Sequence, residues 1–248
     1  MASPPSIEPN DPTPELAGYF AASRDPAVAL VAVVPLWLVY QGLRLELAPE
    51  ERNGAEALVT DSVALFGPRA LLVLELVLGA LVLLAIGVVL RRKLPWGRIA
   101  GVAAIEGSVL GFLLGPLSEV LTRVVLEGAP LRVDVSAPEL VGALGAGLFE
   151  EAVFRLLLLS LASLLLTRAA NAFGLPRATG VVAAVFLSAL VFSWFHHVGP
   201  AGEPFHAPVF AFRAIAGVVL GAIFVVRGFA VVVYAHAAYD VHYFLTHD

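Results

Sequence analysis

The chain has 248 residues, of which 59% are hydrophobic and 14% are charged, and its formal net charge is −5 at pH 7. A composition this apolar, with a mean hydropathy of +0.89, excludes a soluble globular domain and indicates a polytopic membrane protein. The chain contains no Cys, which excludes disulfides, thiolate metal sites and cysteine nucleophiles. The acidic charge balance lacks the basic footprint of a nucleic-acid-binding protein, so we expect no nucleic-acid partner.

The N-terminal part of the chain changes from polar to apolar near residue 26. Residues 1–26 are rich in Pro, Ser, Asp and Glu and lack the basic start and apolar core of a cleavable signal peptide. We predict that they form a disordered cytoplasmic tail. Residues 27–97 are predicted to be N-terminal membrane helices, with an amphipathic helix at 55–66 that lies on the membrane surface or packs beneath the bundle.

Seven apolar runs are long enough to cross a bilayer as helices. They cover residues 27–43, 70–90, 98–125, 138–166, 179–198, 208–226 and 229–245. The predicted fold class is therefore all-α, a polytopic transmembrane bundle of about seven spans whose core is residues 98–248. Arg and Lys residues are more numerous in the loops on the side of the N-terminus, so the positive-inside rule predicts a multi-pass protein of the cell membrane with its N-terminus in the cytoplasm.

The third predicted span carries a stripe of small residues that predicts close packing against another helix. Its members are spaced four residues apart: Gly107, Gly111 and Gly115. On the same span Glu119 and Arg123 are four residues apart and are expected to form an ion pair on one helix face.

The fourth predicted span contains two adjacent carboxylates and an arginine in an otherwise apolar run. A charge at the centre of a bilayer costs about 2.5 to 3.5 kcal/mol on insertion scales, so these side chains need partners. Glu151 and Arg155 are four residues apart with the acid first, which predicts an ion pair on one face of the helix. Glu150 points about 100° away from Glu151 around an α-helix. It is therefore expected to face another partner or a wet cavity.

Two further spans carry polar groups at helical spacing. Phe192 and His196 share a face near the end of the fifth span, and His236 and Asp240 share a face of the seventh. If the three helices pack together, these groups supply the partners that Glu150 lacks.

Such a cluster can activate water in one of two ways. A desolvated carboxylate becomes a serviceable general base, and an imidazole can share the proton or donate a hydrogen bond to a developing oxyanion. Alternatively, Glu150, His196 and His236 could hold a divalent metal such as zinc whose bound water is the nucleophile. Firm ligands are few beyond these three unless Asp240 joins them.

The three motifs together resemble the CPBP family of intramembrane proteases, which includes the type II CAAX prenyl endopeptidases and bacteriocin-processing and immunity-associated relatives. The motifs that carry the resemblance lie on successive spans, between about residues 100 and 245. They read Glu150-Glu151-Ala152-Val153-Phe154-Arg155, then Phe192-Ser193-Trp194-Phe195-His196, then His236-Ala237-Ala238-Tyr239-Asp240.

The resemblance implies a membrane-embedded endopeptidase that hydrolyses a peptide bond in a protein or peptide substrate at the bilayer. It implies that Glu150 activates water together with His196, that His236 and Asp240 stabilise the oxyanion, and that Glu151 with Arg155 has a structural or assisting role. One departure from the family pattern is Asp240, because this position is often Asn and an ionised carboxylate cannot donate a hydrogen bond to an oxyanion. Asp240 must then be protonated, orient His236 or bind metal.

Two other classes of function fit parts of the sequence. An ion-coupled transporter would use intramembrane carboxylates as a relay. The candidates for that relay are Glu106, Glu119, Glu150 and Asp240. A non-catalytic membrane immunity or interaction protein would keep the scaffold without needing Glu150.

Overall fold

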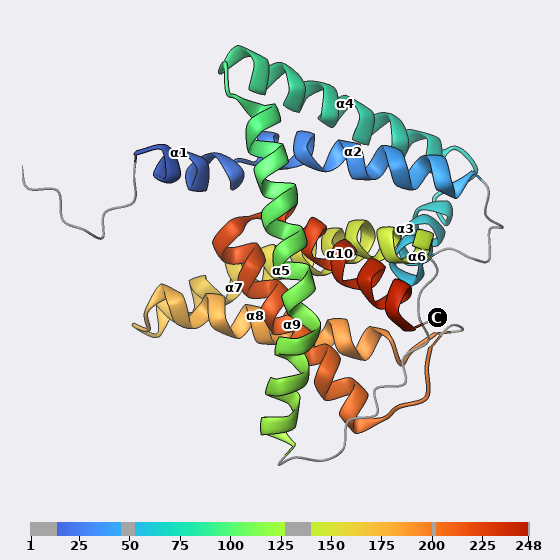
Figure 1. The fold of residues 1–248 in the computed structure, drawn as a ribbon, viewed down its shortest axis with the longest axis vertical. Coiled ribbons are helices and arrows are strands. Elements are labelled where there is room, and N and C mark those ends of the chain that lie inside the picture. The colour runs from blue at the N-terminus through green and yellow to red at the C-terminus, as the bar shows by residue number, and fades with distance from the viewer. Residues whose placement is uncertain (1–13, 46–52, 127–139, 200–201, 248) are drawn as a thin grey trace, which may run out of the picture.

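The structure is a computed structural model that describes residues 14–45, 53–126, 140–199 and 202–247. In these ranges the secondary structure is entirely helical, which confirms the predicted all-α class. The helices are α1 (Pro14–Ser23), α2 (Pro26–Arg44), α3 (Gly54–Ala64), α4 (Ala70–Arg91), α5 (Trp96–Val125), α6 (Leu140–Gly145), the π-helix η2 (Ala146–Leu159), α7 (Ser160–Ala172), α8 (Arg177–Phe195), α9 (Ala207–Arg227) and α10 (Phe229–His247). Figure 1 shows α2 and α4 running side by side, with the long helix α5 crossing the bundle.

Six helical stretches among the described residues are long and apolar enough to cross a membrane. They are Pro26–Arg44, Ala70–Arg91, Trp96–Val125, Leu140–Ala172, Arg177–Phe195 and Ala207–Arg227. The predicted seventh span, α10, is not among them, because its 19 residues include His236, Asp240 and His242. Large apolar side chains such as Leu76 and Leu83 of α4 are more than 60% exposed, which is costly in water and expected in lipid. The chain is a multi-pass membrane protein.

The prediction of a disordered tail is wrong for the part of it that the structure describes, because α1 begins at Pro14. The polar composition of this region obscured a short apolar stretch. Tyr19 and Ala22 pack against the buried core formed by residues of α2, α4 and α5. The Tyr19 hydroxyl also donates a hydrogen bond to Glu106 of α5 at 2.6 Å, and Arg227 lies over the ring of Phe20 at 4.1 Å. Residues 1–13 lie outside the described residues.

Helix α10 lies at the centre of the bundle, where it contacts α5, η2, α9, α6 and α2. Its residues 231–233, all valine, are completely buried. The glycine stripe of α5 packs directly on it. A Cβ atom at Gly111 would lie 2.3 Å from the carbonyl oxygen of Ala235, and one at Gly107 would lie 2.6 Å from that of Val231. The predicted close approach at this stripe is confirmed, and it brings α10 into the middle of the bundle.

The helix that carries the paired carboxylates is not a regular α-helix. Residues 146–159 form η2, a π-helix between the α-helical segments α6 and α7. π-Helical stretches are rare and occur frequently at functional sites. The α-helical geometry expected from the sequence would point Glu150 and Glu151 about 100° apart. In the structure both carboxylates are buried and both approach His236.

Candidate active site

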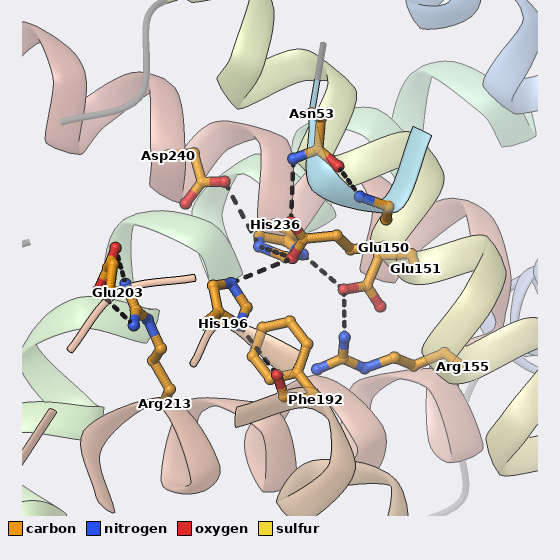
Figure 2. A network of polar contacts seen from close by, with 11 residues as sticks. Asn53, Glu150, Glu151, Arg155, Phe192, His196, Glu203, Arg213, His236 and Asp240 are labelled. Atoms are coloured by element: carbon orange, nitrogen blue, oxygen red, sulfur yellow. Dashed lines mark hydrogen bonds and ion pairs between the residues drawn. The ribbon is translucent and has the colours of Figure 1, made fainter. Parts of the chain in front are cut away.

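The structure brings together all six residues predicted for the site. They come from three helices that are far apart in the sequence: Glu150, Glu151 and Arg155 of η2, His196 at the end of α8, and His236 and Asp240 of α10. Figure 2 shows dashed contacts that join the Glu150 carboxylate to both histidines. Helix α8 is tied to η2 by the hydroxyl of Ser188, which donates to the backbone carbonyl of Phe154 at 2.7 Å.

Glu151 connects an arginine to a histidine. Its Oε1 lies 2.9 Å from Nη1 of Arg155, which confirms the predicted ion pair, and 2.6 Å from Nδ1 of His236. A carboxylate oxygen accepts, so Nδ1 of His236 carries the proton of this hydrogen bond. The guanidinium of Arg155 also lies 4.3 Å from the ring centre of Phe192, within range of a cation–π interaction. Glu151 and Arg155 are both completely buried, so each depends on the other for compensation of its charge.

Glu150 uses its two oxygens differently. Oε1 accepts a hydrogen bond from the side-chain amide of Asn53 at 3.0 Å. Oε2 lies 3.9 Å from Nε2 of His196 and 3.9 Å from Nε2 of His236. Both distances are too long for a direct hydrogen bond and are in the range that one bridging water molecule can span. The expectation that Glu150 faces partners other than Arg155 is thus met by Asn53 and two imidazoles.

His196 occupies the residue directly after α8. The helix ends at Phe195, earlier than the predicted end at 198, and His196 is its C-cap. Its Nδ1 lies 2.9 Å from the backbone carbonyl of Phe192, and the two rings are in edge contact. Because a carbonyl can only accept, Nδ1 of His196 is the donor. In the neutral imidazole the lone pair is then on Nε2, the nitrogen that faces Glu150.

Asp240 lies one helical turn after His236. Its Oδ2 is 3.4 Å from Nε2 of His236, and its side chain is 14% exposed. Of the three roles open to this residue, the position favours orienting His236. A carboxylate at this distance also favours the imidazolium form of His236, in which both ring nitrogens are donors.

An ion pair that the sequence motifs do not include lies beside the site. Arg213 of α9 donates two hydrogen bonds to the carboxylate of Glu203, at 2.8 and 2.9 Å. These hydrogen bonds hold the pKa of Glu203 below its ordinary value. The backbone amide of Glu203 donates to the carbonyl of His196 at 2.9 Å. The pair therefore fixes the segment that follows α8, and with it the position of His196.

Asn53 was also missed, although the sequence contains a signal for it. Asn53 is the N-cap of α3 and Glu56 follows three residues later, which is a common pattern at helix starts. That pattern predicts where α3 begins. It gives no indication that the cap residue reaches Glu150, 97 residues further along the chain. The contact between Arg213 and Glu203 has no comparable local signal.

Two distances between the predicted zinc ligands are longer than those between the ligands of a bound tetrahedral ion. Ligand atoms of a tetrahedral zinc, with bonds of 2.0–2.2 Å, lie roughly 3.3–3.5 Å apart. The distances from Glu150 to His196 and His236 are both 3.9 Å. Within the ranges that the structure covers, no group of three or more His, Cys, Asp or Glu side chains is arranged to hold a metal ion. The metal set Glu150, His196 and His236 stays a prediction.

These residues form a cluster of carboxylates and imidazoles in the interior of a membrane bundle, and such groups are candidates for general acid–base chemistry. Residues 136–242 match a family model described as "Type II CAAX prenyl endopeptidase Rce1-like". That range contains all three motifs, and the match confirms the resemblance to this protease family that the motifs indicated. No curated protein and no solved structure matches the chain significantly.

Proposed function

We propose that this protein is a membrane-embedded endopeptidase in which Glu150 and His196 activate a water molecule for attack on a peptide carbonyl. The observation that carries the proposal is the position of Glu150 Oε2, 3.9 Å from the Nε2 atoms of two histidines on different helices. The match of residues 136–242 to a protease family model supports the same reaction class.

The hydrogen bonds of the site assign a task to each nitrogen. A water molecule placed between Glu150 and His196 donates one hydrogen to Oε2 and the other to the unprotonated Nε2 of His196. Its lone pair is then free to attack the carbonyl carbon. As the C–O bond forms, Glu150 accepts the proton of the water, which is general-base catalysis.

His236 is suited to the charge that develops on the carbonyl oxygen. Glu151 holds its Nδ1, and Asp240 favours the protonated ring, so Nε2–H can donate to the oxyanion. When the tetrahedral intermediate collapses, the C–N bond breaks and the proton held by Glu150 passes to the leaving amine. The products are a carboxylic acid and a free amine, and the acid then loses its proton to water to become a carboxylate. Glu151 and Arg155 position His236 and are not in contact with the reacting atoms in this proposal.

The family description also supplies a substrate class to test, which is a peptide with a prenylated cysteine near its C-terminus. The probe is a fluorescence-quenched peptide ending in Cys-aliphatic-aliphatic-X, with the cysteine either farnesylated or free, presented to the protein in proteoliposomes. We expect cleavage of the farnesylated peptide, because its lipid places the peptide bond at the membrane. Equal cleavage of both peptides would remove prenyl recognition from the proposal and leave peptide hydrolysis.

The decisive variant is Glu150→Gln, which keeps the size of the side chain and removes the base. Loss of a positioned general base costs about 10²- to 10⁴-fold in rate. Glu75→Gln in α4 is the matched control, because Glu75 is exposed and lies outside the site. An equal rate for Glu150→Gln and wild type would refute the proposal. The same assay with a chelator, followed by addition of zinc, tests the metal alternative.

A further inference from the structure

The amide of Asn53 has a single orientation that its two partners determine. Its Oδ1 accepts a hydrogen bond from the backbone N–H of Ala55 at 2.8 Å, as the N-cap of α3. Only an oxygen can accept from that N–H, so the other branch of the amide is the NH₂ group. That group lies 3.0 Å from Oε1 of Glu150 and donates to it. Figure 2 shows Asn53 on the side of Glu150 away from Arg155.

Several contacts hold Asn53 against the site. Helix α3 is anchored through Glu56, which is buried and accepts hydrogen bonds from Tyr40 and Arg44 of α2. Gly145, directly before η2, leaves room for this arrangement. A Cβ atom there would lie 3.0 Å from the ring of Tyr40 and 3.3 Å from Cβ of Asn53. The first turn of α3 is thus fixed on both sides.

We propose that Asn53 is a positioning residue for the catalytic carboxylate, supplied by a part of the chain outside the family-matched domain at residues 136–242. This inference rests on the proposed function of Glu150. By holding Oε1, the amide prevents the carboxylate from rotating and keeps Oε2 directed at the two imidazoles. Its donated hydrogen bond also stabilises the ionised form of Glu150, which is the form that accepts a proton.

Two substitutions separate this role from the capping of α3. Asn53→Ser and Asn53→Asp both keep a side-chain oxygen that caps a helix about as well as Asn does. Asn53→Ser removes the donor in the amide position, and Asn53→Asp also places a second carboxylate beside Glu150. The free energy of a hydrogen bond to a charged group is large enough that its loss can lower a rate about tenfold or more. We therefore expect kcat to fall about tenfold in Asn53→Ser and further in Asn53→Asp. KM should stay unchanged, because a positioning residue acts through Glu150 on the chemical step.

The experiment measures kcat and KM on the farnesylated quenched peptide, with monodisperse elution and helical circular dichroism as checks of folding. The control Asn171→Ser makes the same change at an exposed position of α7 and is expected to leave both constants unchanged. If Glu150→Gln is inactive and both Asn53 variants have wild-type kcat, the positioning role is refuted while the proposed function stands. If Glu150→Gln is fully active, the proposed function fails, and the role of Asn53 fails with it.

Discussion

The buried ion pair between Glu151 and Arg155 is predicted to be worth far more than an exposed pair with the same spacing. The chain contains a matched control, since Glu119 and Arg123 of α5 are also an acid and an arginine four residues apart. The side chains of the buried pair are 0% and 1% exposed, whereas those of the α5 pair are 46% and 58% exposed. Arg155→Met and Arg123→Met remove the same charge from the two environments.

The expected cost of Arg155→Met follows from what the substitution leaves behind. The Glu151 carboxylate would stay buried without its arginine partner, and breaking a buried ion pair by removing one partner typically costs about 3 to 5 kcal/mol. The cation–π contact with Phe192 is lost as well. Arg123→Met removes an exposed pair, which is worth about 0.3 to 0.5 kcal/mol. For a chain of this length each kcal/mol shifts the unfolding temperature by about 2 to 4 °C. The drop should then be roughly 6 to 20 °C for Arg155→Met and about 1 to 2 °C for Arg123→Met.

The assay is thermal unfolding of both purified variants in the same detergent, followed by circular dichroism. The double variant Glu151→Gln with Arg155→Met should recover part of the loss, because it removes the uncompensated charge. Equal unfolding temperatures for the two single variants, or a double variant less stable than Arg155→Met, would refute the reasoning that burial makes this pair costly to break.

Three further predictions use other contacts of the bundle. Gly111→Ala should destabilise the protein by about 1 to 3 kcal/mol through overpacking against α10. Gly101→Ala on the same helix should leave the stability unchanged, because an added Cβ atom there has no neighbour within 4 Å. Equal unfolding temperatures for the two variants would contradict this prediction. Glu203→Gln should be less stable than wild type at pH 7, because Arg213 lowers the pKa of Glu203 in the folded state. The difference in stability between the two proteins should shrink as the pH falls through about 4.3 and below. A stability difference that does not change with pH would contradict this prediction. Glu106→Gln should still cleave the peptide, because the partners of Glu106 lie outside the site. If the wild-type protein takes up solute into vesicles and this variant does not, the transporter alternative is favoured.

Much of the fold could be predicted from hydropathy alone. A stretch such as 70–90 has no stable place except lipid, so its apolar length nearly gives the bounds of α4. The same reasoning failed at α1, where a few apolar residues in a polar segment pack on other helices. It also missed the earlier end of α8 at Phe195, because no local breaker stands there. The cytoplasmic position of the N-terminus stays a prediction.

The members of the polar cluster could be predicted from the sequence. Charges and histidines inside apolar runs are expensive in a bilayer, so their presence at Glu150, Glu151, His196 and His236 is enough to indicate a polar cluster. The i,i+4 spacing also predicted the pairs of Glu151 with Arg155 and of His236 with Asp240, since helical geometry is local.

Only the tertiary structure decided how these groups face one another. Both adjacent carboxylates of η2 lie near His236, and the capping residue of α3 comes within 3.0 Å of Glu150 from 97 positions earlier in the chain. Neither feature follows from spacing, because both depend on which helices pack together and at what depth. Helical periodicity fixes the direction of a side chain relative to its own helix. The glycines of α5 and the packing around α10 fix where that helix lies relative to the others.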